Sequence, residues 1–277
     1  MKGVWGPLLV LIVLLSAVRG VATELTRLVD PAQPRIGLTD PVDIAFDEIR
    51  RGAARRDAGE GVIELLRTGG QFPSAAIVAA PEIQRRAGGF FTFNLDGEPD
   101  ATASAMGTDW QQHIVHAYLS GVLPFETDNL WLPLQTLAQR KRYQYDHSQY
   151  WTRQDVWQTS AQALVSPRGD CEDHALALAD WLISLGADAR VVVGHHGNTG
   201  HAWVVMIHQD QEYLFEATQK DGLGRGRAYP LARLMTNYRP QFMFNRETFW
   251  TNTGSSWITH YRGEPWARKS RYIATGS

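Results

Sequence analysis

The clearest hydrophobic pattern in the chain is helical and starts at Cys171. Apolar residues recur after it at steps of three and four positions, a spacing that places them on one face of a helix. These positions are Ala175, Leu178, Ala179, Leu182 and Leu185. Gly186 follows them, and glycine is a common stop at the C-terminal end of a helix. The pattern therefore predicts a helix with Cys171 in its first turn.

Three apolar runs beyond this helix predict β-strands. The run 189–194 is rich in β-branched residues and is typical of a buried strand. A second strand is expected to start at His201, and a polar turn separates it from a third run at 213–218. Neighbouring antiparallel strands place their residues side by side, so we expect Glu216 to lie within a residue or two of His201.

The remaining patterns predict mainly helices before Cys171. Helical spacing occurs in 42–56, 61–68, 109–121 and 130–145, and strands are expected at 90–95 and 238–250. Together these patterns predict an α+β fold with an α-rich N-terminal region, in which the helix after Cys171 packs on an antiparallel sheet. The residues after Trp266 are expected to form a frayed tail, 267–277.

The first 22 residues have the composition of a secretory signal peptide. Lys2 precedes an apolar core of about 11 residues, short of the ~20 that cross a bilayer, and small residues follow. We therefore predict a periplasmic or secreted protein with no stable membrane insertion after signal cleavage. A formal net charge of −2 and a pI of about 6.5 give no general attraction to nucleic acid. The sequence does not predict an oligomeric state.

Cys171 is the single cysteine, so the chain cannot form an internal disulfide. Such a thiol is either a small buried hydrophobe or a reactive group. The first turn of a helix favours an anion and therefore the nucleophilic thiolate. His201 could serve as the base that a nucleophilic cysteine needs, and Glu216 could orient it. Alternatively, Glu216 could be a strand residue bonded to Lys220 or Arg190.

The segments around these three residues resemble a known family. They are Trp157-Gln158-Thr159, Gly169-Asp170-Cys171-Glu172-Asp173, Gly200-His201-Ala202-Trp203-Val204 and Glu216-Ala217-Thr218. The set is similar to the transglutaminase-like superfamily, which has a papain-like thiol fold, and most similar to its bacterial cysteine peptidases. The likeness covers roughly residues 140–220 and extends towards Asn245. It departs from the family at Glu216, where an aspartate is usual.

The resemblance implies a catalytic domain over 109–266, preceded by an extension (23–108) whose role it does not indicate. It implies acyl transfer from protein or peptide amides through a Cys171–His201–Glu216 triad, with a cysteine protease as the first expectation. The alternatives are a protein-glutamine transglutaminase or deamidase, and a non-catalytic binding or scaffold module on the same fold. No cofactor is expected apart from calcium, which the resembled periplasmic proteases hold beside an Asp-Cys-Glu triplet, here Asp170 and Glu172.

Several other residues have two interpretations. The Trp157 indole could donate to an oxyanion, or the ring could be a core aromatic, whereas the backbone N–H of Cys171 is an oxyanion donor by position. His113 and His116 could form a metal pair or be ordinary helix residues. His195 and His196 could bind zinc with His201 or belong to a substrate loop.

Overall fold

The structure, a computed structural model, describes residues 43, 45–49, 60–84, 89–151, 153, 155–218 and 230–275. All of these residues belong to one compact unit, 41–277. The signal peptide predicted over 1–22 lies outside the described residues. Among the helices of the described part, none has both the length and the apolar character required to traverse a bilayer.

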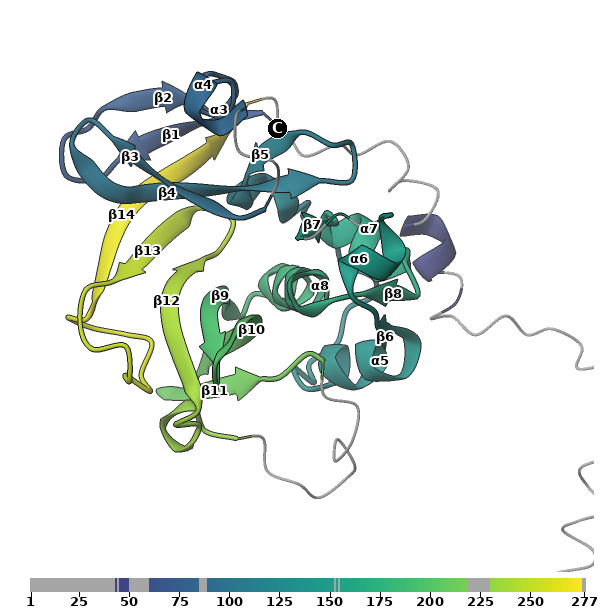
Figure 1. Cartoon of the computed structure of the whole chain (residues 1–277). Coiled ribbons are helices and arrows are strands. Elements are labelled where there is room, and N and C mark those ends of the chain that lie inside the picture. The colour runs from purple at the N-terminus through teal and green to yellow at the C-terminus, as the bar shows by residue number, and fades with distance from the viewer. Residues whose placement is uncertain are drawn as a thin grey trace, which may run out of the picture. The chain divides into compact units, whose positions relative to one another are not determined.

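An antiparallel sheet of eight strands forms the centre of the fold (Figure 1). Its strand order is β11-β10-β9-β12-β13-β14-β1-β2. The strands are β1 (Gly61–Leu65), β2 (Gln71–Pro73), β9 (Asp188–His196), β10 (Thr199–His208), β11 (Gln211–Phe215), β12 (Tyr238–Phe244), β13 (Thr248–Asn252) and β14 (Trp266–Ala274). The strands predicted around 189–194, His201 and 213–218 are therefore three neighbours at one end of this sheet.

The predicted helix is α8 (Cys171–Ser184), which packs against β9 and β10 (Figure 1). Most of its apolar side chains, among them Leu178 and Leu182, are fully buried in the largest hydrophobic cluster of the described residues. Three further helices are α5 (Leu132–Arg140), α6 (Asp146–Gln149) and α7 (Ser160–Val165), and α5 and α7 also contact α8. The predicted α+β class, with the helix after Cys171 on an antiparallel sheet, is confirmed.

Two smaller sheets complete the scaffold around α8. The first contains β3 (Phe91–Leu95), β4 (Glu98–Gly107), β5 (Gln112–Ile114) and β7 (Val156–Trp157), which runs parallel to β4. The second pairs β6 (Arg142–Tyr143) with β8 (Arg168–Gly169) directly before Cys171. The short helices are α3 (Ser74–Val78), α4 (Pro81–Gln84) and the 3₁₀ turns η1 (Val115–Tyr118) and η2 (Ala232–Leu234).

The prediction of an α-rich N-terminal region is wrong for the described residues 60–84 and 89–107, which are mainly strands. The stretch predicted as helix 61–68 forms β1, where Ile63 and Leu65 are fully buried and alternate with half-buried neighbours. The stretch predicted as helix 109–121 is β5 followed by η1. For 61–68 the local pattern fitted both periods, and pairing with the distant strand β14 decided between them.

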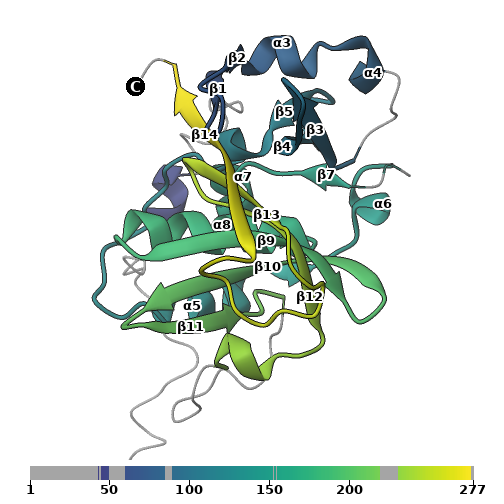
Figure 2. The same cartoon turned by 90° about the vertical axis from the view of Figure 1, so that its left-hand side faces the viewer.

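The predicted frayed tail is also wrong. Residues 266–274 form β14, which pairs with β13 on one side and with β1 on the other (Figure 2). Basic side chains at its solvent-facing positions suggested a tail, but Lys269 Nζ lies 2.5 Å from Glu98 Oε1 and Arg271 Nη2 lies 2.6 Å from Glu64 Oε2. These basic residues therefore bind carboxylates on neighbouring strands.

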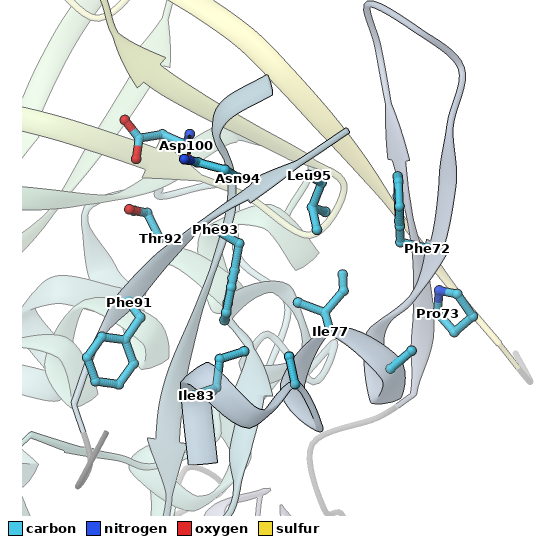
Figure 3. A pocket seen from close by; sticks show the side chains of 12 residues that line it. Phe72, Pro73, Ile77, Ile83, Phe91, Thr92, Phe93, Asn94, Leu95 and Asp100 are labelled. Carbon is cyan, nitrogen blue, oxygen red and sulfur yellow. Dashed lines mark hydrogen bonds between the residues drawn. The ribbon is translucent and has the colours of Figure 1, made fainter. Parts of the chain in front are cut away.

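An apolar hollow of about 710 Å³ lies among β2, α3, α4 and β3. Figure 3 shows Phe93 and Leu95 of β3 facing Ile77 and Ile83 of the two short helices. Phe72, Phe93 and Leu95 are only partly buried there. The hollow belongs to the N-terminal strands, and its lining does not include Cys171, His201 or Glu216.

Candidate active site

The chain turns sharply into α8, and this turn positions Cys171. Asp170 occupies the N-cap position with an extended backbone, and Cys171 is the first helical residue and partly exposed. Gly169 makes the approach possible, because a side-chain carbon there would lie 2.5 Å from Asp173 Oδ2 and 2.7 Å from Lys141 Nζ. Cys171 therefore stands where helix N–H groups lack intrahelical partners, and its own N–H is available to an oxyanion.

His201 and Glu216 come from the two strands beyond α8. His201 lies on β10, and Glu216 directly follows β11. Their side chains are 13% and 12% exposed, and His201 Nε2 lies 2.8 Å from Glu216 Oε2. Cys171 and His201 line the same pocket, and Cys171 is one of the groups that raise the pKa of His201. The structure thus brings the three sequence-predicted residues together: His201 is bonded to Glu216 and shares a pocket with Cys171.

The electrostatics of the pair favour a charged imidazole. Burial alone would lower the pKa of His201, but the proximity and negative charge of Cys171 and Glu216 raise the pKa to about 10. Burial likewise opposes the charge on Glu216, yet His201, Thr218 and Tyr238 hold the pKa of Glu216 at about 2. A charged imidazole paired with a carboxylate is a proton donor of the kind that acyl transfer needs.

Thr218 and Tyr238 are members of the site to which sequence reasoning gave no role. The Thr218 hydroxyl donates to Glu216 Oε1 at 2.6 Å, and the Thr218 backbone N–H donates to the same oxygen at 3.1 Å. The Tyr238 hydroxyl donates to Glu216 Oε2 at 2.7 Å. Thr218 lay within a quoted motif and could have been found, whereas Tyr238 arrives from β12 through strand pairing and has no local signal.

A pocket of about 690 Å³ opens over Cys171 and His201. Its walls are mainly aromatic and histidine side chains together with strand backbone: Phe90, Tyr143, Tyr145, Trp157, Gly194, His195, His196 and Gln241. The Trp157 indole N–H donates to Asp155 Oδ1 at 2.8 Å, and its ring stacks on Phe90. The structure therefore favours Trp157 as a packing aromatic over Trp157 as an oxyanion donor.

Several buried carboxylates lie close to the first turn of α8. Oxygens of Asp146, Asp170 and Asp173 lie within 4.8 Å of one another, and burial raises the pKa of each to about 7. The Cys171 thiol lies 3.2 Å from Glu172 Oε2, and burial raises the pKa of Glu172 well above its usual value. Burial also lowers the pKa of Lys141, which stands beside this cluster and donates to two backbone carbonyls.

This donor set fits the calcium ion that the resemblance implies. Within the described ranges, Asp170 Oδ1 and Glu172 Oε1 are buried and accept no hydrogen bond, and the same holds for one oxygen of Asp146 and of Asp173. Calcium prefers six to eight oxygen ligands, many of them carboxylate. A divalent cation would satisfy oxygens that are costly to bury without a partner.

The other histidines have separate partners. His113 Nε2 lies 2.7 Å from Asp109, whereas the fully buried His116 is bonded through Nδ1 to the Asn245 carbonyl oxygen and has a pKa lowered by burial to about 4. His195 and His196 both line the pocket, and His196 stacks on Tyr238 with ring centroids 4.4 Å apart. The separate partners of His113 and His116 favour the interpretation of that pair as ordinary residues.

Comparison with known proteins finds partial matches. A family model described as the CEP76 peptidase-like domain matches residues 155–261. The centrosomal protein of 76 kDa from Danio rerio is 39% identical over 64 residues, which make up 23% of this chain and 10% of that protein. The Xenopus tropicalis protein of the same name is 38% identical over 64 residues, with the same shares covered. The chain thus spans about a tenth of the length of the curated relatives it matches.

Two similar solved structures are of Legionella pneumophila LapG. One covers 47% of this chain and 71% of LapG at 16% identity, with a TM-score of 0.37. The other, an EGTA-treated form, covers 46% and 69% at 17% identity, with a TM-score of 0.36.

These matches correct two predictions. The matching family model is a CEP76 peptidase-like domain and not the bacterial branch that the motifs indicated. The curated relatives are centrosomal proteins by name, which contradicts the predicted periplasmic or secreted location. That prediction, which depended on the apolar run near the N-terminus, is wrong.

Proposed function

We propose that the chain is a thiol enzyme that transfers the acyl group of a protein or peptide amide, with a cysteine peptidase as its specific activity. The observation that carries this proposal is that His201, bonded to Glu216 at 2.8 Å, lines one open pocket together with Cys171. A nucleophile, a base and an orienting carboxylate in this order are the arrangement for acyl transfer.

The reaction follows from the positions of these groups. The Cys171 thiolate attacks the amide carbonyl carbon, and the backbone N–H of Cys171 donates to the oxyanion that forms. The His201 imidazolium gives its proton to the leaving amine as the C–N bond breaks, which leaves a thioester on Cys171. His201, now neutral, takes a proton from water or from an acceptor amine, which attacks the thioester and releases the thiolate.

Glu216 makes the proton transfers efficient. Its carboxylate accepts from Nε2 of His201, so Nδ1 is the nitrogen left to face the sulfur. The same negative charge stabilises the imidazolium in each half of the reaction. Calcium, if bound, would be held by Asp170 and Glu172 and would supply positive charge that offsets the carboxylates around the thiol.

Thiol labelling and two substrates test the proposal. Iodoacetamide should modify Cys171 faster than it modifies glutathione at pH 7, and fluorescent casein should be cleaved by the wild type but not by Cys171→Ala. Incorporation of a primary amine, dansylcadaverine, into casein would instead identify a transglutaminase. If Cys171→Ala retained the wild-type activity, the thiol mechanism would be wrong.

A second candidate is a non-catalytic binding module on the same fold. The observation that favours it is that the matched relatives are named for a cell structure and not for a reaction. This candidate predicts that Cys171 is alkylated no faster than glutathione and that neither substrate is turned over.

A further inference from the structure

Glu216 is bonded at both of its oxygens, and Tyr238 shares one of them with the catalytic imidazole. Oε2 accepts from His201 Nε2 at 2.8 Å and from the Tyr238 hydroxyl at 2.7 Å. Oε1 accepts from the Thr218 hydroxyl and the Thr218 backbone N–H. Each oxygen of the Glu216 carboxylate thus accepts two hydrogen bonds. The carboxylate cannot rotate without losing some of these charge-assisted bonds.

Tyr238 is itself fixed by the sheet. It opens β12 opposite His196 of β9, and its ring stacks on the His196 ring at 4.4 Å and meets the Trp203 ring edge-on at 5.1 Å. The residue is 3% exposed. Burial and the charge of Glu216 raise the pKa of Tyr238 far above its usual value, so the phenol remains a donor.

We propose that Tyr238 is a positioning residue of the proposed thiol enzyme, whose hydroxyl fixes the Glu216 carboxylate and through it the orientation of the His201 imidazole toward Cys171. This inference rests on the proposed triad and adds to it a member from β12. It also gives a physical reason why a glutamate works where an aspartate is usual. The longer side chain has one more rotatable bond, and the hydroxyls of Tyr238 and Thr218 restrain it.

The test uses the reactivity of Cys171, which requires no knowledge of the substrate. Because the chain has one cysteine, the rate of iodoacetamide alkylation at pH 7 reports this thiol alone. Four proteins are compared: the wild type, Tyr238→Phe, Glu216→Gln and the double variant. Tyr118→Phe is the matched control, because it also loses one buried hydroxyl bond, of 2.8 Å, to the Ala105 carbonyl oxygen.

We expect Tyr238→Phe to alkylate about tenfold more slowly than the wild type, an effect within the range of coupling between residues of one hydrogen-bond network. In the Glu216→Gln background the same change should have little further effect, because Tyr238 acts through Glu216. The downfield proton resonance of His201 Nε2–H should shift in Tyr238→Phe. Tyr118→Phe should lose similar stability and leave both readouts at their wild-type values.

An unchanged alkylation rate in Tyr238→Phe would overturn the proposal. So would an equal effect of Tyr238→Phe in the wild type and in the Glu216→Gln background, and Tyr238 would then be only a packing residue. Failure of the proposed function gives a different result. In that case casein is not turned over, while the coupling between Tyr238 and Glu216 and the shift of the His201 resonance persist.

Discussion

At the scale of single residues, the site divides into members with a motif and members without one. Cys171, His201 and Glu216 were predictable because each lies in a short characteristic segment on a strongly patterned element. Tyr238 and Asp146 were not, because ordinary strand and helix residues reach the site only through the folded chain. Sequence patterns therefore indicate the reacting groups more readily than the groups that hold them.

The charge on Glu216 is predicted to matter more than its size. Glu216→Gln keeps the shape of the side chain but removes the charge that stabilises the His201 imidazolium, so turnover of casein should fall by roughly 10²–10⁴-fold. The exposed Glu247 is a suitable control, and Glu247→Gln should retain wild-type turnover. Wild-type rates in Glu216→Gln would show that this residue is not the third member of the triad.

The pair formed by His201 and Glu216 also predicts how stability depends on pH. The pKa of His201 is raised from 6.5 to about 10. Its contribution to the free energy of unfolding is therefore complete below pH 6.5 and is lost as the pH rises through about 10. The pKa of Glu216 is lowered from 4.5 to about 2, so its contribution is present above pH 4.5 and is lost as the pH falls through about 2.

Both contributions are complete between about pH 4.5 and 6.5. The difference in melting temperature between the wild type and Glu216→Gln should therefore be largest in that window and should shrink towards pH 10. A difference that grows steadily from pH 6 to pH 10 would contradict the assignment of a charged imidazole.

Calcium is predicted to stabilise the chain through Asp170 and Glu172. A ligand at 100 times its Kd adds about 2.7 kcal/mol to the free energy of unfolding, which corresponds to a rise of several degrees in Tm. Calcium should produce this rise relative to EGTA in the wild type, and Asp170→Asn should abolish it. Asp210→Asn alters a carboxylate whose side chain is 95% exposed and should respond like the wild type. Equal melting temperatures in calcium and EGTA would show that the carboxylates serve another purpose.

At the scale of elements, prediction succeeded where the decisive contacts are local in sequence. The helix α8 and the strands β9, β10 and β11 are consecutive along the chain and are neighbours in space. The local sequence therefore already contained the elements against which each of them packs. By contrast, β1 pairs with β14, and the register places Gly61 opposite Ala274. No local pattern shows such a partner, and the helical interpretation of 61–68 failed for that reason.

The turn into α8 depends on a glycine that lacks room for any side chain. In Gly169→Ala the new carbon would lie 2.5 Å from Asp173 Oδ2, and Asp173 is fully buried. We expect a loss of about 1–3 kcal/mol in the free energy of unfolding, measured by urea denaturation. Gly200→Ala is the matched control, because no heavy atom lies within 4 Å of its added carbon. Equal stability of the two variants would mean that the approach to Cys171 is looser than the structure indicates.

At the scale of the whole molecule, β14 connects the N-terminal strands to the rest of the main sheet (Figure 2). Its Ser270 hydroxyl donates to the Ala101 carbonyl oxygen of β4 at 2.6 Å, and its Tyr272 ring stacks on the buried His116 at 5.3 Å. The strand β14 therefore pairs with β1 and completes the hydrophobic core around it. The strands β1 and β2 consequently belong to the same sheet as β10, which carries His201.

This closure predicts that the C-terminal residues are indispensable. Deletion of 267–277 would expose the hydrogen-bonding edges of both β1 and β13 and uncover Ile63 and Leu65, which are fully buried. Unpaired edges and exposed apolar residues favour association, so the truncated protein should aggregate or lose its cooperative melting transition. Arg268→Ser changes only an exposed side chain of the same strand and should melt like the wild type. A truncated protein that melts cooperatively near the wild-type temperature would show instead that β14 is an addition to an already complete sheet.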